Sequence, residues 1–64
     1  MNRFVVVSTQ ENNTQVRSQL RSMGISTAVQ AKDCILKCII KILVVCNEEQ
    51  TALLKNSDLI VRDL

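Results

Sequence analysis

The chain has 64 residues, one aromatic side chain and a net charge of +2. This length allows one small domain, residues 1–64, which buries only about 60% of its unfolded surface. A hydrophobic content of 47% excludes a disordered chain. The basic residues are scattered and lack aromatic neighbours, which argues against a nucleic-acid-binding surface.

The first half of the chain predicts a strand, a helix and a second strand. Branched residues at 3–8 predict a buried strand, and residues 9–13 predict a polar turn. Asn12 and Gln15 have the spacing of a capping box, and Val16, Leu20 and Met23 recur at helical intervals before Gly24, which suits a left-handed helix end. Residues 25–31 alternate as in an edge strand, and residues 31–33 predict a tight link to the next element.

The longest apolar stretch, residues 34–46, predicts the central strand. Its two alternating faces are apolar except for Lys37 and Lys41, and residues 39–45 are the most strand-like part because they are rich in Ile and Val. A helix over residues 34–42 is the alternative, since Asp33, Lys37 and Lys41 would then form one polar stripe.

The last third predicts another helix and strand. Asn47 and Gln50 repeat the capping-box spacing, and two glutamates follow Asn47, where the helix dipole favours acidic groups. Residues 52–54 provide the expected buried side, Asn56 suits a left-handed cap, and residues 58–64 predict an edge strand.

Two successive β-α-β units follow from this order. They predict an α+β fold, the ferredoxin-like plait, in which four antiparallel strands have the first and third strands at the centre and two helices on one face. The helical alternative for residues 34–42 would instead give a flavodoxin-like βα alternation.

The residue types do not point to catalysis or to a cofactor. The chain has three cysteines and no histidine, so no histidine can serve as a base for Ser8 or Thr9. Cys34 and Cys38 lie four residues apart, which does not match the spacing of a zinc site, and we interpret the thiols as core residues of a reducing compartment. On the same strand face, Cys38 and Cys46 are expected to be buried and slow to react.

The composition also predicts the location of the protein. The longest apolar run contains lysines and is shorter than the roughly 20 residues that cross a bilayer. No secretory signal is recognisable, so we expect a soluble cytoplasmic protein that contacts neither membrane nor nucleic acid.

The predicted sheet leaves an apolar patch on the side away from its helices. Four aliphatic residues of the third strand surround two lysine stems there, next to an uncharged edge. Exposed apolar patches of this kind mark interaction surfaces. The expected partner-binding residues are Ile35, Lys37, Ile39, Lys41, Leu43 and Val29.

Several stretches resemble the propeptide-like inhibitors of subtilisin-type serine proteases. The similarity includes the strand at residues 4–7, the Met23-Gly24 helix end, the second helix at residues 47–56 and the strand at residues 58–63. The resemblance implies the plait fold, and docking on a protease through the helix-free face of the sheet.

We therefore expect a small interaction module that binds a partner protein and regulates it as an inhibitor. The resemblance implies that this partner is a subtilisin-like serine protease. In isolation the uncharged edge and apolar face predict a homodimer. The alternative is a dimeric small-ligand-binding regulatory domain.

Overall fold

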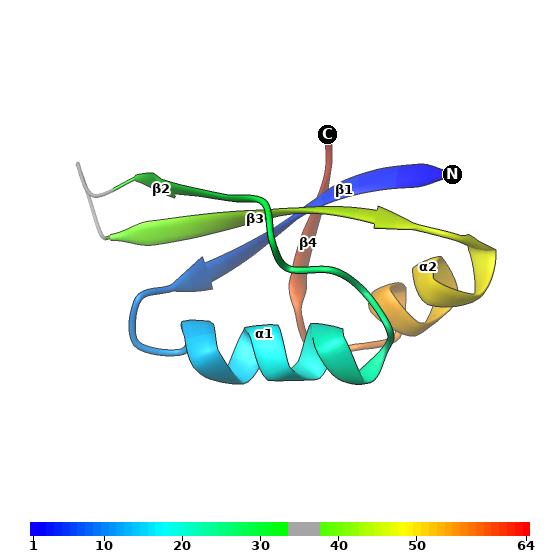
Figure 1. The fold of residues 1–64 in the computed structure, drawn as a ribbon, viewed down its shortest axis with the longest axis horizontal. Coiled ribbons are helices and arrows are strands. Elements are labelled where there is room, and N and C mark those ends of the chain that lie inside the picture. The colour runs from blue at the N-terminus through cyan, green and yellow to red at the C-terminus, as the bar shows by residue number, and fades with distance from the viewer. Residues whose placement is uncertain (34–37) are drawn as a thin grey trace.

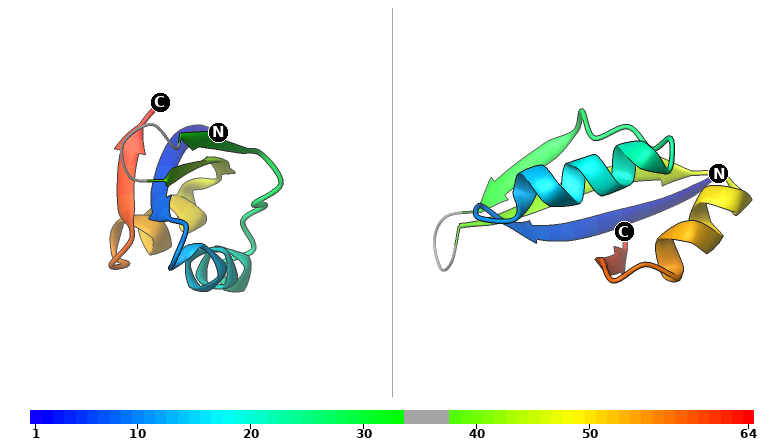
Figure 2. Two further views of the ribbon diagram at one scale, coloured as in Figure 1. Left: turned by 90° about the vertical axis from the view of Figure 1, so that its left-hand side faces the viewer. Right: turned by 90° about the horizontal axis from the view of Figure 1, so that it is seen from below.

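The strands and helices follow one another in the order β-α-β-β-α-β. The computed structural model describes residues 1–33 and 38–64. All paired strands are antiparallel in the order β2-β3-β1-β4, and both helices cover one face of the sheet (Figure 1, Figure 2). The ferredoxin-like plait is confirmed, and the flavodoxin-like alternative is wrong. The elements are β1 (Asn2–Thr9), α1 (Asn13–Ser22), β2 (Gln30–Asp33), β3 (Ile39–Cys46), α2 (Glu48–Lys55) and β4 (Ile60–Asp63).

The two central strands are the expected ones. β1 and β3 pair along their whole length, from Asn2 opposite Cys46 to Thr9 opposite Ile39. Successive side chains of β3 are alternately buried and accessible, as in a strand covered on one face. The strand predicted for residues 39–45 is confirmed, whereas the helix alternative is wrong for residues 39–42. Its remaining part, residues 34–37, lies outside the described residues.

The core lies between the sheet and the helix layer. Aliphatic side chains fill it, together with the only aromatic ring and one thiol. Lys55 places its ammonium group 5.6 Å from the centre of the Phe4 ring. The buried core residues are Phe4, Val6, Val16, Leu20, Ile25, Ile40, Ile42, Val44, Cys46 and Leu54.

Gly24 ends α1 in the conformation that the sequence predicts. Its φ angle is 76°, in the left-handed region that glycine adopts without a steric penalty. The amide of Gly24 donates to Arg21 O at 2.9 Å, and the amide of Ile25 donates to Leu20 O at 3.1 Å. These two bonds form a Schellman motif, and Ile25, buried like Leu20, fixes the exit of the chain in the helix layer.

The second strand is shorter and later than predicted. The prediction placed it at residues 25–31 with a link at 31–33, but β2 is Gln30–Asp33. The reason is that Ile25 and Thr27 are buried before the chain reaches the sheet, and Figure 1 shows this segment rising from the end of α1 to β2. It reaches β3 at Val29, whose carbonyl accepts a hydrogen bond from Leu43 N at 2.9 Å.

The two predicted capping boxes have different outcomes. At α2 the box is confirmed, since Asn47 Oδ1 accepts from Gln50 N at 2.8 Å and Gln50 Oε1 accepts from Asn47 N at 3.0 Å. At α1 it is wrong, because the Asn12 side chain turns back and accepts from Thr9 N at 2.8 Å. Asn12 N donates in return to Thr9 Oγ1 at 3.0 Å, so this pair closes the turn before the helix.

Three smaller predictions fail near the ends of elements. Asn56 has a φ angle of −88° and is not left-handed. Of the predicted buried side of α2 only Leu54 is buried, and Leu53 is 53% exposed, because this short helix packs at one end of the sheet. Cys38 is half-buried and precedes β3 with a φ angle of 50°, so it does not lie on the buried face of that strand.

Candidate protein-interaction surface

The face of the sheet opposite the helices has no covering layer among the described residues, and we name it the open face. In β3 the side chains of Ile40, Ile42, Val44 and Cys46 are buried toward the helices. Strand alternation therefore places the intervening side chains on the open face. Residues of the open face include Arg3, Val5, Val7, Thr9, Val29, Ala31, Ile39, Lys41, Leu43, Val45, Ile60, Arg62 and Leu64.

The register joins these residues into rows across the sheet. In the central row Val5 lies opposite Leu43 on one side and opposite Arg62 on the other. Val29 extends this row, since its carbonyl bonds to Leu43 N. In the next row Lys41 lies opposite both Val7 and Ala31.

The aliphatic side chains of the open face remain accessible to water. The accessible fractions are 37% for Leu43, 53% for Val45 and 57% for Val29. On β4 the exposed fraction is 58% for Ile60. A shallow apolar hollow of about 280 Å³ extends from Val29 to Leu64. Contiguous exposed apolar surface is a common feature of protein-interaction sites.

A second hollow, of about 300 Å³, lies between β3 and β4 on the same side. Val5, Val7 and Ile39 form its apolar part, and Lys41 and Arg62 provide two positive charges. Asp63 also borders it from the edge strand, although the register places Asp63 opposite the buried Phe4, toward the helix layer.

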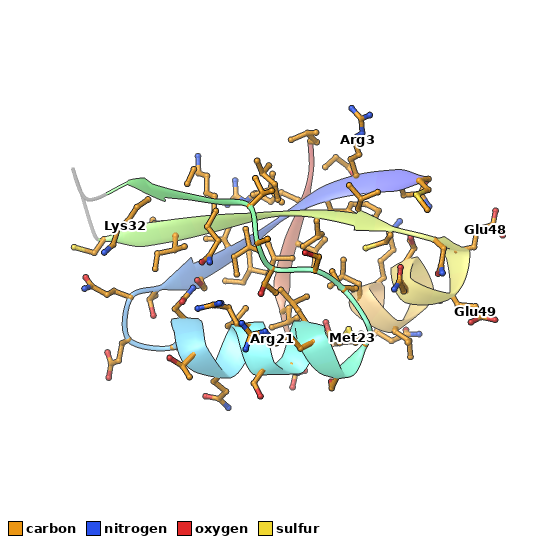
Figure 3. The ribbon with its side chains drawn as sticks, viewed as in Figure 1. Arg3, Arg21, Met23, Lys32, Glu48 and Glu49 are labelled. Atoms are coloured by element: carbon orange, nitrogen blue, oxygen red, sulfur yellow. The ribbon has the colours of Figure 1, made fainter. Side chains whose placement is uncertain are left out.

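Charge is distributed unequally between the two sides of the molecule. Outside the end of β2, where the register places Asp33 opposite Ile39, the charged residues of the open face are Arg3, Lys41 and Arg62, all basic, and Figure 3 shows Arg3 pointing away from the helices. The two helices carry charges of both signs, with Glu48 and Glu49 in the first turn of α2 and Arg21 and Lys55 in the last turns of α1 and α2. The open face is therefore both apolar and basic.

The sequence predicted part of this surface. The structure brings Val29, Ile39, Lys41 and Leu43 together on the open face, and places Ile35 and Lys37 outside the described residues. The contributions of β1 and β4 were missed. Residues 4–7 are all apolar and show no alternation in sequence, so only the structure separates Phe4 and Val6, which face the core, from Arg3, Val5 and Val7, which face outward.

The thiols do not form a described metal site. Cys46 is fully buried, and burial raises the pKa of its thiol above the usual 9.0. Among residues 1–33 and 38–64, no three His, Cys, Asp or Glu side chains are grouped to hold a metal ion. The core role predicted for Cys46 agrees with its burial, and Cys34 lies outside the described residues.

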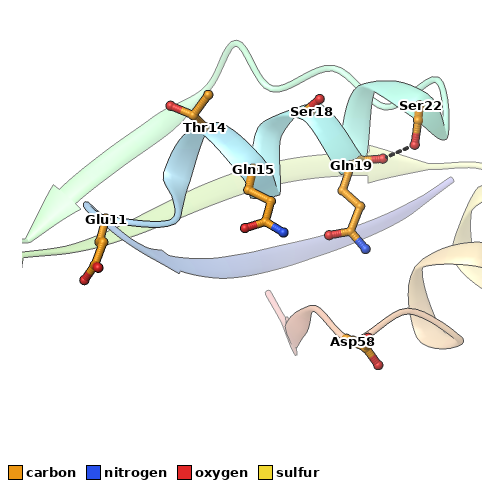
Figure 4. Close-up of a pocket in the computed structure, with 7 residues that line it drawn as sticks. All are labelled: Glu11, Thr14, Gln15, Ser18, Gln19, Ser22 and Asp58. Carbon is orange, nitrogen blue, oxygen red and sulfur yellow. Dashed lines mark hydrogen bonds between the residues drawn. The ribbon is translucent and has the colours of Figure 1, made fainter.

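A larger hollow lies along α1, and polar side chains line it. It has a volume of about 800 Å³, and its side chains come from α1, the preceding turn and the chain before β4 (Figure 4). Ser22 Oγ donates to Gln19 O at 2.6 Å, so this hydroxyl is engaged with its own helix. The hollow lacks histidine, as the whole sequence does, and its side chains have the pattern of a solvated helix surface. The lining residues are Glu11, Thr14, Gln15, Ser18, Gln19, Ser22 and Asp58.

No family model, curated protein or solved structure that was compared matches the chain significantly. In the part of the chain that the structure describes, neither helix has the length and apolar character needed to cross a bilayer.

Proposed function

We propose that this protein is a small interaction module that binds and regulates a partner protein through the open face of its sheet. The single observation that carries the proposal is the contiguous exposed aliphatic surface on that face, which includes Val29, Leu43 and Val45. Covering these side chains would remove apolar surface from water and favour association by about 25 cal/mol per Å².

The resemblance described above supports the same face. In the inhibitors that the chain resembles, docking through the helix-free face of the sheet is implied, and a subtilisin-like serine protease is accordingly one candidate partner. In this proposal the side chains of the open face contact the partner, while the helix layer keeps the sheet in shape. The regulatory effect would come from covering a surface of the partner.

Leu43→Glu tests the proposal, with Leu53→Glu as the matched control. Both variants make the same chemical change at accessible leucines, one on the open face and one on α2. Wild type and both variants are used as baits in an extract of the source cells, and the retained proteins are compared by quantitative mass spectrometry. Proteins that wild type and Leu53→Glu retain, and Leu43→Glu loses, are the expected result.

The expected loss of affinity for such a partner is on the order of a hundredfold, since a leucine that the complex would bury is replaced by a charge. Circular dichroism must show that Leu43→Glu keeps its fold. A retained set that is the same for all three baits would contradict the proposal.

A further inference from the structure

The charges of the open face indicate the chemistry of its partner. Building on the proposed function, we propose that the open face binds a protein segment that carries aliphatic and acidic side chains, in preference to a second copy of this chain. The observation is the set of three basic residues, Arg3, Lys41 and Arg62, among the exposed aliphatic side chains.

These cations are placed around the apolar surface rather than apart from it. Arg62 lies opposite Val5 at the β4 end of the central row, and Lys41 lies between Ala31 and Val7 in the next row. Arg3 lies opposite Val45 and borders the apolar hollow. A segment whose aliphatic side chains cover Leu43 and Val5 would therefore meet positive charges on several sides.

Carboxylates are the groups that these cations recognise best in a protein. Arginine presents a planar fork of N–H donors that matches a carboxylate, and lysine presents a compact point charge. The flanks of an apolar contact are the usual place for charges that speed encounter and select partners. The open face thus selects for Asp or Glu beside Leu, Ile or Val in its partner.

A second copy fits this surface poorly. A two-fold face-to-face dimer brings the same patch of both copies together. The Arg3, Lys41 and Arg62 side chains of both copies would then share one interface, and like charges across an interface disfavour binding. The homodimer expected from the sequence is for this reason the less favoured occupant.

The helix side of the molecule carries charges of both signs. Glu11 and Asp58 border the polar hollow (Figure 4), whereas Arg21 lies in the last turn of α1 and Lys55 in the last turn of α2. The preference for an acidic partner therefore depends on the open face alone.

The test uses a displayed library of random-sequence peptides selected on the full-length protein. The affinity of the selected peptides is then measured by fluorescence polarisation for two variants. Lys41→Glu/Arg62→Glu reverses two open-face charges, and Arg21→Glu/Lys32→Glu reverses one Arg and one Lys elsewhere. Arg21 lies on α1. Lys32 belongs to β2 and lies opposite the buried Ile40 of β3. Both variants change the net charge equally, and both must keep the circular dichroism spectrum of the wild type.

The expected peptides combine aliphatic with acidic residues, and they bind more weakly as the salt concentration rises. Each reversed charge should lower their affinity about tenfold, so Lys41→Glu/Arg62→Glu should lower it about a hundredfold. The control variant should change the affinity little. Should the reversed protein fold poorly, Lys41→Gln/Arg62→Gln gives the same direction of effect with a smaller loss.

Other outcomes overturn this inference in distinguishable ways. Peptides without acidic residues that are lost on Leu43→Glu would leave the proposed function intact and refute only the charge preference. Absence of selected peptides, or peptides that bind Leu43→Glu normally, would refute both. Sedimentation that shows a dimer broken by Leu43→Glu would make the second copy the occupant. Binding to phosphatidylserine-containing vesicles but not to peptides would show that the open face binds a membrane surface, and would refute the proposal.

Discussion

Gln50 joins the two helices, and its replacement should reveal how much this link stabilises the fold. Its Oε1 accepts from Asn47 N at 3.0 Å, and its Nε2 donates to Gly24 O at 2.9 Å. One side chain therefore completes the N-cap of α2 and also satisfies a carbonyl at the C-terminal end of α1. Gln50→Ala removes both contacts, whereas Gln50→Glu keeps the acceptor for Asn47 and loses the donor.

The structure sets the expected order of stability. A hydrogen bond contributes about 1 kcal/mol net, so Gln50→Ala should lower the free energy of unfolding by about 2 kcal/mol, less a few tenths for the better helix propensity of alanine. Gln50→Glu should cost about 1 kcal/mol. In a domain of this size 1 kcal/mol lowers the melting temperature by about 4–8 °C.

Thermal and urea unfolding followed by circular dichroism measure these differences. Gln19→Ala and Gln19→Glu are the controls, since Gln19 has an exposed side chain on α1 and should change stability by less than about 0.5 kcal/mol. Measurement at high salt screens the charge that Gln50→Glu adds. Gln50 does not stabilise the fold in this way if Gln50→Ala and Gln19→Ala have the same free energy of unfolding, or if Gln50→Glu is as stable as wild type.

Two further predictions concern Gly24 and Cys46. Gly24→Ala should cost about 1–2 kcal/mol in urea unfolding, because its φ angle of 76° is one that alanine rarely adopts. Gly24→Asn should cost less, since asparagine tolerates this region better, and equal costs would contradict this account. Burial raises the pKa of the Cys46 thiol, so the unfolded thiol ionises first and the free energy of unfolding should decline as the pH rises above 9.0. Cys46→Ala should lack this part of the decline, and an unchanged pH profile in that variant would show that the thiol does not contribute.

The sequence predicted the parts of the fold that depend on local pattern. The apolar character of β1 and β3 identified the central strands, and glycine at position 24 identified the end of α1. The start of β2 could not be predicted, since it depends on how far Ile25 and Thr27 are drawn into the helix layer. The Asn12 prediction failed because two local partners compete for one side chain, and Thr9 is the one bonded.

The candidate surface was predictable only for the strand whose alternation was clear. Ile39, Lys41 and Leu43 were assigned correctly to one face, since every second side chain of a strand points to the same side of the sheet. The basic character of the surface depends on Arg3 and Arg62, which are far apart in the sequence. Only the pairing of β1 with β3 and β4 brings them to the same face.

A sheet covered on one side would also link the abundance of this protein to that of a partner that binds the open face. A chain of this length has a free energy of unfolding of roughly 3–10 kcal/mol. A partner that binds only the folded form, at about a hundred times its dissociation constant, adds about 2.7 kcal/mol to that value. Molecules without a partner would unfold more often and be degraded sooner by cellular proteases. The uncovered valines and leucines of β1 and β3 would thus make the lifetime of the protein depend on occupancy of the open face.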